Sequence, residues 1–188
     1  VLVNNYLDMD GLVCISADHY GGAVQATEYL CKLGHCKIGL LSGRFSPQVS
    51  EARIEGFVKT LAKYDIPVDD RFIADIEPAL EDGEEIMTRM LREVDRPTAF
   101  FCTNDTIAAG AMKAVTRAGL RVPEDIAIIG FDDSYISRVV EPELTTVRID
   151  AAKMGCLAMQ TLFDLIAGMP VEKAHIQIPT ELIVRGTA

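Results

Sequence analysis

The chain has 188 residues, and its formal net charge at neutral pH is −10. This length allows one domain or parts of two, and a hydrophobic fraction of 49% is ordinary for a protein with a packed core. The strong negative charge repels nucleic-acid phosphates, so we expect any DNA contact to come from another segment. No apolar run reaches the roughly 18 residues that would span a bilayer.

The cysteines indicate a reducing compartment. They are five in number, an odd count, and no two have the C-x-x-C spacing. We therefore expect free thiols and a cytoplasmic location. We expect no metal and no cofactor, because no phosphate-binding, nucleophile or metal-ligand motif is present. The opening stretch VLVNN reads as a strand with no lead-in, which indicates a fragment whose upstream part is missing.

Strands and helices alternate in the expected secondary structure. In chain order we expect strands at 1–5 and 11–16, a helix at 23–33, a strand at 37–43, a helix at 50–64, a strand at 71–76, a helix at 81–94, a strand at 98–103, a helix at 105–118 and a strand at 126–133. Over the repeating part, a new strand begins about every 30 residues, the size of a strand–helix–strand unit. This rhythm predicts an α/β fold with a doubly wound parallel sheet.

The rhythm changes after residue 134. A short strand at 145–149 precedes a long amphipathic helix at 151–167, and two strands at 175–179 and 181–186 end the chain. The elements outside the repeating part are expected to belong in part to a second, incomplete subdomain.

Polar residues stand where several expected strands end. Asn104 follows the strand at 98–103, Asp132 closes the strand at 126–133, and Arg53 lies in the first turn of a helix that follows a strand. The carboxyl ends of parallel strands share one edge of a sheet, and ligands bind at that edge. An amide, a carboxylate and a guanidinium together offer donors and acceptors suited to a polyhydroxylated small molecule.

Each of these residues also has an ordinary structural explanation. Asn104 or Asp105 alone is typical of a helix N-cap, Arg53 alone of a surface arginine, and Asp132 alone of a turn. Only their shared position at the strand-end edge favours ligand binding. If they share it, Asn104 faces the ligand and Asp105 caps the helix that follows. Replacing Arg53 or Asp132 by alanine is then expected to abolish the response to the ligand and leave the fold intact. No histidine can be paired with a nucleophile, so catalysis is not expected.

A family resemblance covers nearly the whole chain. The stretches that carry it are GHCKIGLLSG, ARIEGFVKTL, AFFCTNDTIAAGAMKAVTRAGLRVPEDIAIIGFDDS, EPELTTVRID and ELIVRGT. In this order they resemble the effector-binding core of the lactose-repressor/galactose-repressor (LacI/GalR) family of bacterial transcription regulators. The resemblance implies a two-lobed core similar to periplasmic sugar-binding proteins. It also implies that the helix-turn-helix DNA-binding domain and the hinge helix are absent from this chain.

The resemblance assigns ranges to the lobes. Residues 1–20 and 143–170 are expected to form part of an N-terminal lobe. Residues 21–142 and 171–188 are expected to form a nearly complete C-terminal lobe.

The resemblance also implies roles for individual residues. Arg53, Asn104 and Asp132 match effector-contacting positions of the family. Ile76 falls where relatives often place an aromatic ring that stacks on the ligand, and here the side chain is aliphatic. Asn4 falls near a polar position of the N-terminal lobe. Two more positions are implied: Asp18 is at the first crossover between lobes, and Pro47 replaces a ligand-contacting polar residue of some purine-binding relatives.

The function implied is that of a sugar-responsive regulator core. A sugar or sugar derivative would bind between the lobes of a homodimer and so change its affinity for operator DNA. Two alternatives stay open from the residues alone: a periplasmic sugar-binding protein of a transport system, and a small α/β enzyme.

Overall fold

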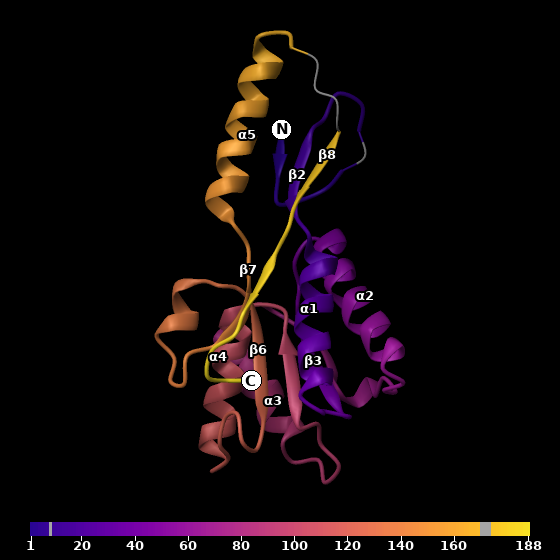
Figure 1. The fold of residues 1–188 in the computed structure, drawn as a ribbon. Helices are drawn as coiled ribbons and strands as arrows, with labels where there is room; N and C mark the ends of the chain where they lie inside the picture. Colours follow the sequence, from indigo (N-terminus) through magenta and orange to yellow (C-terminus); the bar gives the residue numbers. More distant parts are fainter. Residues whose placement is uncertain (8, 170–173) are drawn as a thin grey trace.

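The computed structural model describes residues 1–7, 9–169 and 174–188 of the chain. Two lobes of unequal size lie end to end (Figure 1). The small lobe has a three-stranded sheet and the large lobe a six-stranded sheet. Within the described residues, no helix is both long enough and apolar enough to cross a membrane.

The large lobe is a doubly wound sheet, as predicted. Its strands are β3 (Ile38–Gly43), β4 (Ile73–Ile76), β5 (Ala99–Cys102), β6 (Ala127–Asp132), β7 (Thr145–Arg148) and β9 (Glu181–Ile183). Its α-helices are α1 (His19–Lys32), α2 (Pro47–Lys63), α3 (Leu80–Met90) and α4 (Asp105–Arg117). The strand order is β4-β3-β5-β6-β7-β9, and only the β7–β9 pair is antiparallel.

Both faces of this sheet are buried, which explains the unbroken apolar runs in its strands. Successive side chains of a strand point to opposite faces. Phe101 and Ile129 therefore pack in the core under α1 and α2, whereas Phe100 and Ile128 pack in the core under α3 and α4. Each helix pair covers one face, and the strand ends remain open at the edge nearer the small lobe (Figure 1).

Glycine allows the helices of each pair to approach closely. A Cβ atom on Gly110 of α4 would overlap the Leu80 carbonyl oxygen of α3. A Cβ atom on Gly56 of α2 would come within 2.7 Å of the Tyr20 carbonyl oxygen of α1. Both helix pairs therefore pack backbone against backbone at these positions.

The small lobe is built from segments far apart in the chain. Its strands are β1 (Leu2–Val3), β2 (Cys14–Ala17) and β8 (His175–Ile178), paired in parallel in the order β1-β2-β8. Helix α5 (Ala151–Ile166) lies alongside this sheet (Figure 1). Met154 and Ala158 of α5 pack on Ile15 and Ile178 of the strands.

The chain passes between the lobes three times, after β2, after β7 and after β8. Two of the crossovers are hydrogen-bonded to each other. The Asp18 amide donates to the Ile178 carbonyl at 2.8 Å, and the Thr180 hydroxyl donates to the Asp18 carbonyl at 3.3 Å. The crossovers therefore form a linked waist between the lobes.

Strand pairing shifts two of the expected lobe boundaries. Residues 143–170 were assigned to the small lobe, but Thr145–Arg148 pair with β6 in the large sheet. Residues 171–188 were assigned to the large lobe, but His175–Ile178 pair with β2 in the small sheet. The reason is long-range pairing: a strand of four residues can join either sheet, and its own sequence does not select one.

Candidate effector site at the strand ends

Arg53 is the centre of the site. It is 2% exposed, and its guanidinium reaches three partners. Nη1 donates to the Thr103 carbonyl, and Nη2 lies 3.2 Å from His19 Nδ1 and 3.4 Å from Asp132 Oδ1. Helix α2 begins at Pro47, earlier than predicted, since proline fits the first helical position. Arg53 therefore lies in the second turn of α2, with its side chain directed to the strand ends.

Aromatic rings hold the guanidinium in place. Its central carbon lies 3.9 Å from the Phe131 ring centroid and 5.0 Å from that of Phe45. Stacking on these rings compensates part of the lost hydration of the cation. Burial nevertheless lowers the pKa of Arg53 to about 10, and the carboxylate of Asp132 opposes that shift. The side chain is charged at neutral pH and its direction is fixed.

Asp132 stands at the end of β6 in a backbone conformation that few residues adopt. Its φ is +108°, and that of Asp133 is +50°. Positive φ values at non-glycine residues are strained and cluster at functional sites. Burial raises the pKa of Asp132 to about 6, and Arg53 opposes the rise. This carboxylate is thus ionised at neutral pH and half-buried beside a cation.

Asn104 is the N-cap of α4. Its side-chain oxygen accepts from the Ile107 amide at 2.8 Å, and the residue is 8% exposed. Since the oxygen serves as the cap, the amide nitrogen is the group left for a ligand. Asn104 adjoins Thr103, whose carbonyl binds Arg53. Arg53, Asn104 and Asp132 therefore lie together at the strand-end edge of the large sheet, as predicted.

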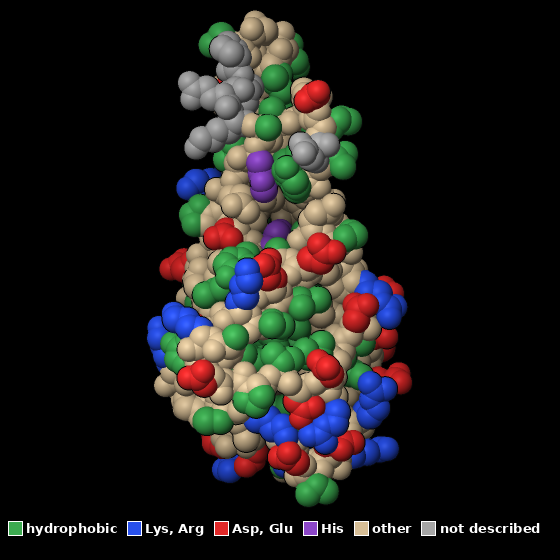
Figure 2. Space-filling model, turned by 90° about the vertical axis from the view of Figure 1, so that its right-hand side faces the viewer, with side chains coloured by type: hydrophobic (Ala, Val, Ile, Leu, Met, Phe, Trp, Pro, Cys, Tyr) green, Lys and Arg blue, Asp and Glu red, His purple; other side chains and the backbone are tan. Residues whose placement is uncertain are grey.

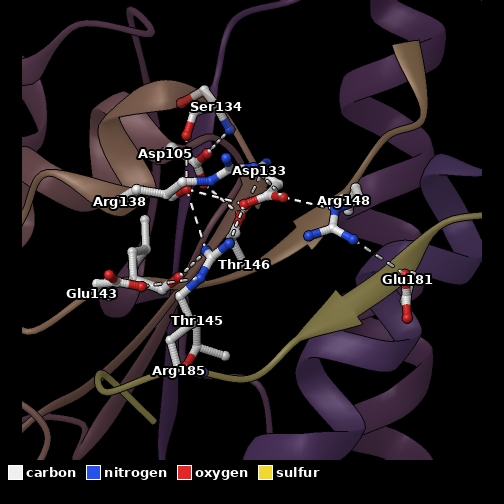
Figure 3. Close-up of polar contacts among 12 residues, drawn as sticks. Asp105, Asp133, Ser134, Arg138, Glu143, Thr145, Thr146, Arg148, Glu181 and Arg185 are labelled. Atoms are coloured by element: carbon white, nitrogen blue, oxygen red, sulfur yellow. Dashed lines mark hydrogen bonds and ion pairs between the residues drawn. The ribbon is translucent and has the colours of Figure 1, made fainter. Parts of the chain in front are cut away.

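Asp105 does not cap α4, contrary to one sequence expectation. Its carboxylate turns the other way and accepts from the Ser134 amide at 2.6 Å and from the Thr146 hydroxyl at 2.5 Å (Figure 3). Burial raises the pKa of Asp105, and these hydrogen bonds oppose the rise. Asp105 therefore fixes the loop that follows β6, directly after the site residue Asp132.

His19 also lies at this site, although the sequence patterns did not predict it. Arg53 is a donor only, so Nδ1 of His19 must accept from it. Burial and the charge of Arg53 lower the pKa of His19 to about 3. The imidazole is therefore neutral and carries its proton on Nε2, a buried donor without a partner among the described residues. The only signal available was its position directly after Asp18 at the first crossover.

A cavity of about 230 Å³ lies between the lobes, and His19 is part of its wall. Ser16 and His175, from β2 and β8, line it as well and lie 2.8 Å apart, hydroxyl to Nε2. Tyr6 and Tyr20 add aromatic surface. Figure 2 shows histidine side chains at the hollow between the two lobes. The cavity thus combines ring faces with donors and acceptors from both lobes.

The remaining predicted residues are placed differently. Ile76 ends β4 and is in register with Gly43 at the strand-end edge, half-buried against the α3–α4 core. Asp18 lies at the first crossover, where its side chain caps α1 by accepting from the Gly21 amide at 2.8 Å. Asn4 is exposed, and its neighbour Asn5 lines the cavity instead. None of the six predicted residues, Arg53, Asn104 and Asp132 included, is among the lining residues of this cavity. Arg53 is connected to the cavity through its contact with His19.

Comparison with known proteins gives the family. The periplasmic binding protein-like domain matches residues 27–188. The HTH-type transcriptional repressor PurR of Pasteurella multocida is 38% identical over 174 residues, which are 91% of this chain and 52% of that protein. A LacI-family regulatory protein from Chloroflexus aggregans superposes with a TM-score of 0.91 at 32% identity, over 97% of this chain and 65% of that one. A complex of the transcriptional regulator CelR with cellobiose superposes with a TM-score of 0.91 at 26% identity, over 99% and 57% of the two chains.

The chain therefore belongs to the periplasmic binding protein-like domain family, and it corresponds to the core region of LacI-family regulators. It spans about half the length of the curated relatives it matches, 52% for PurR of P. multocida.

Proposed function

We propose that this core binds a sugar or sugar derivative at the strand-end edge and thereby changes the affinity of a cytoplasmic homodimer for operator DNA. The observation that carries the proposal is the position of Arg53, between Asp132 and His19 and beside the cavity that separates the lobes. A ligand that fills the cavity and extends past His19 to Arg53 would touch both lobes, because the cavity is lined by residues of both. Its affinity would then depend on how the lobes are arranged.

The polar groups favour an uncharged, hydroxyl-rich effector. Asp132 is an acceptor, and the Nε2 proton of His19 is a donor without a partner among the described residues. Each can bind a hydroxyl group, whose oxygen both donates and accepts. The positive charge of Arg53 is already balanced by Asp132 at 3.4 Å, which leaves little attraction for a phosphate. The cellobiose complex of CelR shows that a structural relative binds a neutral sugar.

Regulation would follow from a shift between two lobe arrangements. An effector changes that equilibrium only by its differential affinity for the two arrangements. The net charge of −10 argues that operator contacts are made by a segment other than these residues. Because the relatives are repressors, a regulator is favoured over a transport protein or an enzyme.

A thermal-shift screen tests the effector class. The panel contains four neutral sugars: D-glucose, D-galactose, D-ribose and cellobiose. Glucose 6-phosphate is added to test a charged sugar, and hypoxanthine to test a purine. A true effector at about 100 times its dissociation constant should stabilise the protein by about 2.7 kcal/mol. A response to hypoxanthine alone would replace the sugar assignment by a purine one, and a response to the phosphate alone would contradict the argument from charge.

A gel-shift assay on the natural full-length protein tests the regulatory role. Binding to its own promoter region should change when the ligand from the screen is added. If the ligand binds but DNA affinity is the same with and without it, the transport alternative becomes the better explanation.

A further inference from the structure

The carboxylate of Asp133 is enclosed by cationic and hydroxyl donors. Its side chain is 2% exposed and accepts from Arg148 Nε at 2.7 Å, Arg185 Nη2 at 2.5 Å and Ser137 Oγ at 3.1 Å (Figure 3). Although burial raises the pKa of Asp133, these hydrogen bonds outweigh it and hold the pKa at about 2. Asp133 is therefore a fixed negative charge at any physiological pH.

Asp133 immediately follows the site residue Asp132, and both have positive φ. A strained dipeptide keeps its conformation only when its surroundings determine it. Here the carboxylate of Asp133 is held on one side, and the next amide, of Ser134, is held by Asp105 on the other. The direction of the Asp132 side chain therefore depends on the anchoring of Asp133.

Arg148 connects this anchor to the waist between the lobes. It is the last residue of β7, in register with Asp132 of β6, and the chain crosses to the small lobe directly after it. Its guanidinium also lies 3.6 Å from Glu181 Oε2, at the start of β9 and just after the crossover that follows β8. One arginine thus contacts the neighbour of a site residue and stands beside two of the three crossovers.

We propose that Asp133 is a positioning residue: through Arg148 it directs Asp132 toward Arg53 and ties the strand-end site to two of the lobe crossovers. The inference rests on the proposed function, because Asp132 is taken there as an effector contact. A change in the crossovers that moves Arg148 would then reach Asp132 through one side-chain contact, from Arg148 to Asp133, and the peptide bond between Asp132 and Asp133.

The test uses variants that keep every charge and change only reach and shape. Asp133→Glu lengthens the carboxylate, and Arg148→Lys removes the planar fork of donors. Arg138→Lys is the matched control, because Arg138 lies 3.5 Å from the same carboxylate but is exposed and is not beside a crossover. Each protein is studied at a temperature at which circular dichroism shows it to be folded.

The first readout needs no ligand. The pKa of the Asp132 carboxyl, about 6 in the parent protein, is followed by carbon-13 NMR. We expect Asp133→Glu and Arg148→Lys each to move it by about half a unit or more, because Asp132 leaves its place beside Arg53. Arg138→Lys should leave it unchanged.

The second readout is calorimetric affinity for the tightest-binding sugar among D-glucose, D-galactose, D-ribose and cellobiose. Asp133→Glu and Arg148→Lys should each weaken it about tenfold, the loss expected for one charge-assisted hydrogen bond. If the Asp132 pKa stays fixed in both variants while they lose only thermal stability, Asp133 serves the stability of the lobe alone and the proposal is overturned. If the pKa moves but no sugar binds the parent protein, the positioning role stands and the sugar assignment fails. Should Asp133→Glu not fold, Arg148→Lys alone decides.

Discussion

Nη2 of Arg53 lies 3.4 Å from Oδ1 of Asp132, although 79 positions separate the two residues in the chain. The contact joins helix α2 to the end of strand β6 at the edge that faces the small lobe. His19 completes the arrangement, with Nδ1 3.2 Å from the same Arg53 nitrogen. Three segments thus meet at one guanidinium, and several predictions depend on it.

Arg53→Ala should abolish effector binding and also destabilise the protein. From the sequence alone, Arg53→Ala and Asp132→Ala were expected to leave the fold intact. The burial of Arg53 changes this expectation for Arg53→Ala. The substitution leaves Asp132 without its cation and opens a cavity, so we expect the free energy of unfolding to fall by about 2–4 kcal/mol. Urea unfolding measures the stability and calorimetry the binding.

Arg44→Ala is the matched control for that experiment. Arg44 also pairs with carboxylates, Asp75 at 3.2 Å and Glu77 at 3.1 Å, but it is 57% exposed. Exposed ion pairs contribute about 0–1 kcal/mol. A loss of stability as large as that of Arg53→Ala would show that burial is not what makes Arg53 important.

Replacing His19 should change the pH dependence of stability, because His19 and Asp132 contribute to it with opposite signs. The folded pKa of Asp132, about 6, exceeds its ordinary 3.8, so its contribution to stability is lost as pH rises from about 4 to 6. The folded pKa of His19, about 3, is below its ordinary 6.5, so its contribution grows as pH rises through the same window. The two contributions oppose each other between pH 4 and 6.

His19→Gln removes one side of this balance. Relative to the parent protein, its free energy of unfolding should fall more steeply with rising pH between 4 and 6, by about 1 kcal/mol per pH unit. Asp132→Asn should change the slope in the opposite direction. Urea titrations at several pH values measure both slopes, and identical slopes in all three proteins would mean that neither group titrates abnormally.

Two helical glycines should respond in opposite ways to alanine. In Gly110→Ala the new methyl group meets the backbone of α3, so we expect a loss of about 1–3 kcal/mol from overpacking. A Cβ atom on Gly155 of α5 meets nothing within 4 Å, so Gly155→Ala should gain about 0.5–1 kcal/mol from helix propensity. Thermal unfolding of the two variants tests the packing of α3 on α4, and a neutral Gly110→Ala would contradict it.

The thiols should fall into two classes. Cys36 and Cys156 are exposed, whereas Cys14, Cys31 and Cys102 are buried. Burial also raises the pKa of Cys31 and Cys102, which suppresses their reactive thiolate forms. Ellman's reagent should therefore modify two thiols rapidly in the folded protein and all five in denaturant. A third fast thiol would show that one of the buried positions opens readily.

Local sequence patterns predicted most of the large lobe. A doubly wound sheet could be predicted from the apolar runs of β3, β5 and β6 and from the amphipathic spacing of the helices between them. Each of these patterns is formed by residues that are close together in the chain. The edge that collects Arg53, Asn104 and Asp132 followed from the rule that parallel strands end on one side. The cap of α4 was attributed to Asp105, since adjacent Asn and Asp have almost the same capping propensity.

By itself, the sequence determined the alternation of strands and helices, the buried faces and the chain positions from which a site could be built, since these depend on side chains a few residues apart. Tertiary structure alone decided that His19 meets Arg53, that Asp133 is enclosed by Arg148 and Arg185, and that β7 and β8 join different sheets. Each of these contacts joins residues from separate segments. Their partners are chosen by the packing of whole elements, which places a donor beside an acceptor from a distant part of the chain.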